Sequence, residues 1–188
     1  ATLSATSVLL RGPSSSPPPE GAAGLETELF DDLAVQIDLV RYLTDREIVK
    51  VTARRDPIEQ VEVRLALLGG ASATCRAGRA ARSEDRVTVT AGGRTYQLRA
   101  GSDRARPSGV ARTALDLADG TWRRLTVARG SLAQSGQRQL EGFVAAVRSR
   151  AATPPGMADG MAVMLAIEAA RRSLAAGAVE VEVPPVPA

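Results

Sequence analysis

The spacing of apolar residues changes several times along the chain. Between residues 30 and 43 it is three and four, which predicts an amphipathic helix with apolar positions at Leu33, Ile37, Val40 and Leu43. Residues 3–11 alternate loosely and contain Ser, Thr and Val, so they predict a strand. The segment 12–24 between them carries four prolines among serines, and we expect a mobile loop there.

Strand-like segments follow one another between residues 48 and 127. In the run 61–67 apolar residues alternate with polar or small ones, so one face of this strand should be buried and the other wetter. Gly69-Gly70, Gly92-Gly93 and Asp119-Gly120 separate successive runs and favour tight turns between neighbouring strands. The predicted sheet is therefore largely antiparallel.

The helical period returns after residue 130. It predicts helices at 137–150 and 158–176, with Gly177 ending the second, then a short strand at 180–183 and a proline-rich tail at 184–188. The whole order is strand, helix, many strands, two helices and a strand. It predicts a single α+β domain over residues 1–188, an open-faced, largely antiparallel sheet with helices packed on one face.

Composition removes several kinds of chemistry. Histidine is absent, which excludes a Ser-His-Asp triad, a Cys-His pair and a histidine-ligated zinc, and we expect no metal site. Cys75 is the only cysteine, which excludes an internal disulfide and favours a reducing compartment. No apolar run approaches the roughly 18 residues of a membrane helix, so we expect a cytoplasmic protein with no membrane partner.

The charge pattern does not favour nucleic acid as a partner. The 24 basic residues are interleaved with 21 acidic ones, and the net charge is only +3. Aromatic residues are 3% of the chain, too few for a platform on which bases stack. Lys50, the only lysine, is expected to extend from a strand face rather than to form a Schiff base.

Two segments carry a family resemblance. At the end of the chain, QLEGF at 139–143, Pro154-Pro155 and Asp159-Gly160 precede a helix with Ala169 and Ser173. Near its start, FDDLAVQIDLVRYL is followed by REIVKVTA. In this order the segments resemble the second domain of the Gfo/Idh/MocA oxidoreductases, which include glucose-fructose oxidoreductase and inositol dehydrogenase. The resemblance implies that domain's substrate-binding and dimerising fold.

The sequence departs from the family pattern where the nucleotide should bind. The family begins with a Rossmann domain and its glycine fingerprint, whereas this sequence resembles only the domain that follows. No G-x-G-x-x-G occurs, and Gly69-Gly70 lies between two predicted strands rather than before a helix. We therefore expect the chain to use no NAD(P) or other cofactor of its own.

A second departure concerns proton transfer. The family carries an Asp and, four residues later, a His on one helical face near the substrate, and the resemblance places Asp31 and Val35 at those positions. A valine cannot accept a proton, so the active site resembles a degenerate one.

Five residues of the predicted helix are candidates for the site. Asp31 and Asp32 are the catalytic candidates, although both could instead cap the helix. Gln36, Arg41 and Tyr42 are candidates for substrate binding, although Arg41 could simply pair with Asp38.

Three functions remain open on these grounds. The first is a stand-alone domain that binds a small organic substrate, dimerises, and works with a separate Rossmann-domain subunit. The second is a cofactor-independent cyclase, isomerase or dehydratase of specialised metabolism, and the third is an interaction scaffold without a ligand. The homodimer would use the open sheet face, because the strands hold more apolar residues than one helical layer can cover: Val63, Leu65, Leu67, Tyr96, Leu98, Leu115, Leu117 and Trp122.

Overall fold

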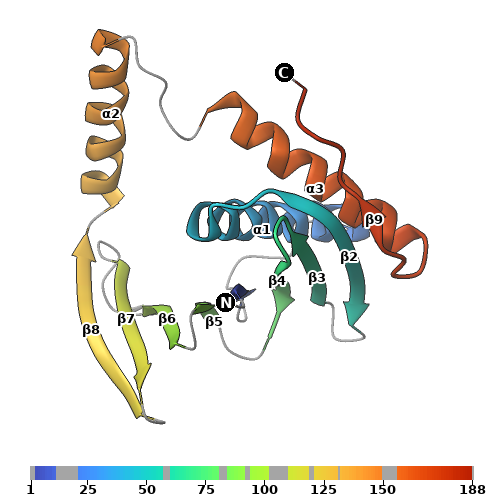
Figure 1. Cartoon of the computed structure of the whole chain (residues 1–188), viewed down its shortest axis with the longest axis horizontal. Coiled ribbons are helices and arrows are strands. Elements are labelled where there is room, and N and C mark those ends of the chain that lie inside the picture. The colour runs from blue at the N-terminus through green and yellow to red at the C-terminus, as the bar shows by residue number, and fades with distance from the viewer. Residues whose placement is uncertain are drawn as a thin grey trace.

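The computed structural model describes residues 3–11, 21–56, 60–80, 84–91, 94–101, 110–118, 121–130, 132–149 and 156–187. Three helices and nine strands lie in these ranges (Figure 1). The helices are α1 (Gly21–Thr44), α2 (Leu132–Ser149) and α3 (Met157–Ala175). The strands are β1 (Leu3–Arg11), β2 (Ile48–Asp56), β3 (Gln60–Leu67), β4 (Ala71–Arg79), β5 (Glu84–Ala91), β6 (Arg94–Gly101), β7 (Val110–Ala118), β8 (Thr121–Gly130) and β9 (Val181–Glu182).

All nine strands join one sheet in the order β8-β7-β6-β5-β1-β4-β3-β2-β9. Every neighbouring pair is antiparallel except β1 and β4, which run parallel. The first strand therefore lies in the middle of the sheet, and β9 adds to the edge of β2. The α+β class predicted from the sequence, with its largely antiparallel sheet, is confirmed.

The core lies between this sheet and two helices, since α1 packs on β1, β4 and α3, while α3 packs on β2 and β9. The strands contribute alternate residues that are fully or almost fully buried, including Val51, Val61, Val63, Leu65 and Cys75. From α1, Leu33, Ile37 and Val40 are completely buried against them. Their spacing of three and four is the one from which the helix was predicted.

The burial of β3 corrects one argument for a dimer. Val63, Leu65 and Leu67 face the helices and are at most 2% exposed, so they contribute nothing to an apolar open face. The side chains of Tyr96, Leu98, Leu115, Leu117 and Trp122 lie outside the described part of the structure. On β2, β3 and β4, the positions that alternate with the core residues are mostly Thr, Ser, Arg and Glu.

The start of α1 also differs from the prediction. The helix begins at Gly21, so residues 21–24 are helical rather than part of a loop, and residues 12–20 lie outside the described ranges. Asp31 and Asp32 stand more than two turns inside the helix. The interpretation that they cap its N-terminus is therefore wrong.

Two predicted turns are confirmed by their backbone geometry. Gly69 and Gly70 have φ values of 80° and 79° in the turn between β3 and β4. Gly177, with φ of 76°, ends α3. There the N–H of Ala178 donates to Ser173 O and that of Gly177 to Leu174 O, at 2.8 and 3.2 Å, which is a Schellman motif.

The other two predicted turns, Gly92-Gly93 and Asp119-Gly120, lie outside the described residues. The strands that flank each of these turns are nevertheless paired in hairpin register, with Ala91 opposite Arg94 and Ala118 opposite Thr121.

Helix α2 is set apart from α1 and α3, beyond the end of β8 (Figure 1). Its side chains at Gln137 and from 139 to 149 are all exposed apart from Ala146, which is intermediate. Only two of the three predicted helices therefore cover the core. No helix of the described part is long and apolar enough to cross a membrane.

Candidate functional site

The outer face of α1 presents a row of exposed residues: Asp31, Val35, Asp38 and Tyr42. Their spacing of four, three and four places them along one side of the helix. Val35 is 65% exposed and Tyr42 is 82% exposed, which is unusual for such side chains on a helix that buries its opposite face completely. We call these four residues the α1 ridge.

Asp31 and Val35 occupy successive turns of the ridge. These are the positions at which the resemblance places the family's Asp and His. The carboxylate of Asp31 is available to accept hydrogen bonds from a ligand, whereas the isopropyl group of Val35 offers only an apolar contact. Within the described residues, the ridge therefore supplies a hydrogen-bond acceptor but no imidazole beside it.

Asp32 and Gln36 lie on the inner side of α1 and are 5% and 3% exposed. The side-chain amide of Gln36 donates from Nε2 to Arg76 O at 2.9 Å and accepts at Oε1 from Arg76 N at 3.2 Å. Nε2 also lies 3.3 Å from Asp32 O. Gln36 thus satisfies backbone groups of β4 from the helix layer, and the structure separates it and Asp32 from the ridge.

Arg41 connects the end of α1 to the start of α3. Its side chain is only 10% exposed, with Nη2 3.1 Å from Glu47 Oε1 and Nη1 3.5 Å from Asp159 Oδ1. Nη1 also donates to Asp159 O at 3.2 Å. The sequence left open a pair with Asp38, but Arg41 turns to the other side of the helix. Of the predicted site residues, only Asp31 and Tyr42 share the ridge.

Besides pairing with Arg41, Asp159 stabilises the beginning of α3. Its carboxylate accepts a hydrogen bond from the N–H of Gly156, the N-cap residue, at 2.8 Å. This carboxylate at the third helical position satisfies a backbone donor that the helix leaves free. Arg41 and Asp159 also line a surface groove closed on one side by Val183, Pro184, Pro185 and Val186. Nη1 and Nη2 of Arg41 are paired in this network, whereas its Nε is buried without a hydrogen-bond partner.

Lys50 and Cys75 do not have the properties of reactive groups. Lys50 Nζ lies 2.7 Å from Glu180 Oε1. This hydrogen bond and the charge of Glu180 raise the pKa of Lys50. A Schiff-base lysine requires the opposite shift, a lowered pKa. Burial raises the pKa of the Cys75 thiol to about 12. Cys75 is fully buried in β4 and packs there as a small apolar residue.

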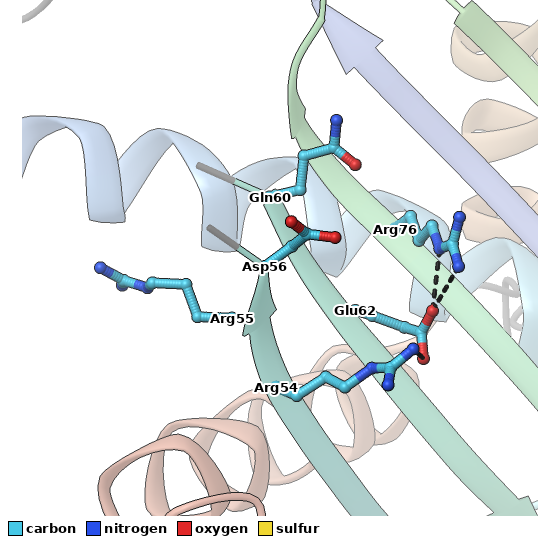
Figure 2. Close-up of a pocket in the computed structure, with 6 residues that line it drawn as sticks. All are labelled: Arg54, Arg55, Asp56, Gln60, Glu62 and Arg76. Carbon is cyan, nitrogen blue, oxygen red and sulfur yellow. Dashed lines mark hydrogen bonds and ion pairs between the residues drawn. The ribbon is translucent and has the colours of Figure 1, made fainter. Parts of the chain in front are cut away.

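A polar pocket on the other face of the sheet was not predicted from the sequence (Figure 2). Glu62 of β3 is at its centre, with a side chain only 8% exposed. It forms ion pairs with Arg54, Arg64 and Arg76 at 2.9, 3.1 and 2.6 Å. The alternation of apolar and charged residues in β3 indicated the face. The strand register that brings the arginines together could not be predicted from the sequence.

The ionisation of Glu62 reflects two opposed effects. Burial pushes its pKa up, but the hydrogen bonds and charges of Arg76 and Arg54 outweigh burial and hold the pKa below its ordinary value of 4.5. Glu62 is therefore a carboxylate at neutral pH. The described residues contain no group of three or more acidic or cysteine side chains placed to hold a metal ion.

Comparisons with known proteins identify the architecture. No protein-family model and no curated protein matches the sequence. Among solved structures, levoglucosan dehydrogenase in complex with NADH and L-sorbose superposes with a TM-score of 0.67 at 16% identity, over 98% of this chain and 58% of that one. UDP-N-acetylglucosamine 3-dehydrogenase from Acidithiobacillus ferrooxidans gives 0.66 at 17% identity, over 95% and 54%.

A third structure, aldose-aldose oxidoreductase from Caulobacter crescentus complexed with glycerol, gives a TM-score of 0.66 at 17% identity, over 96% of this chain and 55% of that one. The chain thus spans little more than half the length of the structures it resembles. These likenesses confirm the fold that the sequence resemblance implied, that of Gfo/Idh/MocA-type oxidoreductases.

Proposed function

We propose that this chain is the substrate-side unit of an oxidoreductase-like assembly. It binds a small organic molecule at the α1 ridge and forms a homodimer through its open sheet face in the cytoplasm. It does not transfer hydride by itself. A separate Rossmann-domain subunit supplies the nucleotide when the reaction runs.

The observation that carries this proposal is the α1 ridge. A helix that buries Leu33, Ile37 and Val40 completely on one side leaves Val35 and Tyr42 largely in water on the other. Exposed apolar and aromatic side chains beside a carboxylate suit a hydroxylated organic ligand, which offers both hydroxyl groups and apolar ring faces. The solved structures named above carry carbohydrate names, so sugars are the first class to test.

The absence of autonomous hydride transfer is argued from the residues of the chain. A dinucleotide needs a glycine-rich turn that leads from a strand into a helix N-terminus. The Gly69-Gly70 turn leads instead into β4. With Val35 at the position of the base, the ridge also lacks the imidazole that would take the hydroxyl proton as hydride leaves.

The dimer is proposed from the shape of the sheet. In the described part of the chain α1 and α3 pack on one face of the sheet, and the opposite face of β2, β3 and β4 carries half-exposed polar side chains. An uncovered sheet of this width suits an isologous interface, in which the same surface serves both subunits. The part of this face that the structure describes carries polar side chains, so the interface would be polar rather than apolar there.

Titration followed by NMR tests the ligand and the nucleotide together. Levoglucosan and L-sorbose are expected to shift amide signals of residues 31–42, and Asp31→Asn to weaken that binding about tenfold through loss of a charged acceptor. Asp45→Asn, an exposed change in the turn after α1, is the matched control. NADH and NADPH are expected not to bind. Tight nucleotide binding, or no sugar response at the ridge, would overturn the proposal.

Sedimentation velocity over a hundredfold range of concentration tests the dimer separately, because a strict monomer removes the interface but leaves the ridge intact. The cofactor-independent alternative predicts instead that the chain alone turns over a pathway intermediate and that Asp31→Asn abolishes the turnover.

A further inference from the structure

The arginines around Glu62 form a ladder set by strand pairing. Arg54 lies directly opposite Glu62 in the β2–β3 register, and Arg76 lies directly opposite it in the β3–β4 register. Arg64, two positions along β3, reaches the same carboxylate from the side. Figure 2 shows Arg54 and Arg76 converging on Glu62 from either side. Arg55 points away from the cluster, and its Nη2 lies 3.9 Å from Glu26.

Glu62 holds the guanidinium groups together without using up their donors. Arg54 and Arg64 each direct one nitrogen to Glu62 Oε1, and Arg76 directs two to Oε2. Both carboxylate oxygens are thereby engaged, whereas a guanidinium has donors on all three nitrogens. The side chains of Arg54, Arg64 and Arg76 are 55%, 62% and 49% exposed, so they remain accessible to solvent, and Arg54 and Arg76 line the pocket.

The charge of the cluster favours an anion. Three guanidinium groups face two carboxylates, those of Glu62 and Asp56, which leaves one positive charge in excess. The buried carboxylate removes much of the repulsion that would otherwise drive the arginines apart, so the cationic groups are arranged before any ligand arrives. Planar guanidinium groups with free adjacent N–H donors match the oxygens of phosphate and carboxylate in bidentate geometry.

The size of the pocket restricts the ligand. Its volume is about 180 Å³, and Asp56 and Gln60 complete its wall beside the arginines. Pockets for drug-sized molecules begin at roughly 300 Å³. The pocket therefore suits a single phosphate group or a small carboxylate better than a nucleotide.

We propose that the Arg54–Glu62–Arg76 pocket is a binding site for a phosphate group, either inorganic phosphate or the phosphate of a small phosphorylated metabolite. The site lies on the opposite face of the sheet from the α1 ridge. It does not depend on the ligand proposed for the ridge. It does share the sheet face proposed for the homodimer, so phosphate binding is measured on the monomer.

The test uses the full chain at low ionic strength, at concentrations below any self-association found by sedimentation. Inorganic phosphate is titrated and followed by calorimetry and by NMR signals of residues 54, 62 and 76, with sodium chloride at equal ionic strength as the reference. Glucose 6-phosphate and glucose form two further arms. Phosphate binding with tighter binding of the sugar phosphate points to a metabolite, whereas equal binding points to the free ion, and both support the site.

Arg76→Gln and Arg54→Gln are expected to weaken phosphate binding about tenfold or more, as for the loss of a hydrogen bond to a charged group. Arg86→Gln is the matched control. By register Arg86 lies on the same sheet face, where it pairs with Glu84 at 3.1 Å, and its removal should change binding less than about twofold.

If Arg76→Gln fails to fold, the half-exposed Arg54 provides the same comparison. A response no larger than that to chloride, or an equal loss with Arg86→Gln, would refute the site. Glucose binding as tightly as its phosphate would refute it too.

Discussion

Ser173 provides a sharp test of how the edge of this sheet is closed. Strand β9 pairs only with Lys50 and Val51 of β2. It is too short to reach Ala53, so it supplies no acceptor for the N–H of Ala53. The completely buried hydroxyl of Ser173 in α3 accepts that N–H at 2.8 Å. The same hydroxyl donates to Val179 O at 2.6 Å, just before β9. One oxygen atom thus joins α3, β2 and the segment that leads into β9.

Ser173→Ala removes this oxygen and almost nothing else. It leaves the buried N–H of Ala53 without its acceptor, which costs about 1–3 kcal/mol, and loses a second hydrogen bond worth about 0.5–1.5 kcal/mol. We expect the free energy of unfolding to fall by about 3 kcal/mol in total. For a chain of this length, that corresponds to a Tm lower by roughly 6–12 °C.

Urea unfolding followed by circular dichroism measures the loss, with Ser72→Ala as the control. Ser72 is an exposed serine of β4, so its removal should change stability by less than about 0.5 kcal/mol. Hydrogen exchange adds a local readout. The N–H of Val183, which donates to Val49 O at 3.0 Å, should exchange faster in Ser173→Ala than in the parent chain because β9 is less firmly held.

A loss below about 0.5 kcal/mol for Ser173→Ala would refute this reasoning, because it would mean that water or a backbone shift satisfies Ala53 at no cost. An equal loss for Ser72→Ala would show that serine removal acts through something other than this contact.

Three further predictions concern Cys75, Glu62 and Gln36. Cys75 should react with iodoacetamide at pH 8 at least about a hundredfold more slowly in the folded chain than in guanidinium chloride, since burial raises its pKa to about 12, and comparable rates would contradict its burial. Because the pKa of Glu62 lies below 4.5 in the folded chain, its contribution to stability is complete above that pH and is lost as the pH falls through the folded value. Urea unfolding from pH 6 to pH 3 should therefore show a steeper loss for the parent than for Glu62→Gln, and parallel curves would argue against the cluster. Gln36→Leu should cost about 2 kcal/mol by removing the partner of the Arg76 backbone, while any sugar binding at the ridge persists in the folded variant. Loss of sugar binding without loss of stability would instead support the sequence-based hypothesis that Gln36 binds substrate.

Much of the fold followed from local pattern. The spacing of Leu33, Ile37 and Val40 located the buried side of α1, and the alternation in residues 61–67 located the buried side of β3, because periods of 3.6 and two residues fix which side chains share a face. Gly177 ended α3 as predicted, since the left-handed conformation there favours a residue without a side chain. The pattern failed at the start of α1, where glycines and alanines of residues 21–24 continue a helix that the neighbouring prolines argued against.

The sequence by itself determined the kind of fold, the lack of histidine chemistry, and which turn could not hold a dinucleotide. Only the tertiary structure decided which polar residues are free to act. Asp31, Asp32, Gln36, Arg41 and Tyr42 looked equivalent along one helix, yet packing against β4 and α3 engages Gln36 and Arg41 in structural bonds and leaves the α1 ridge exposed. The Arg54–Glu62–Arg76 ladder arose in the same way, because strand register brings together residues that lie far apart in the sequence and no local period encodes register across three strands.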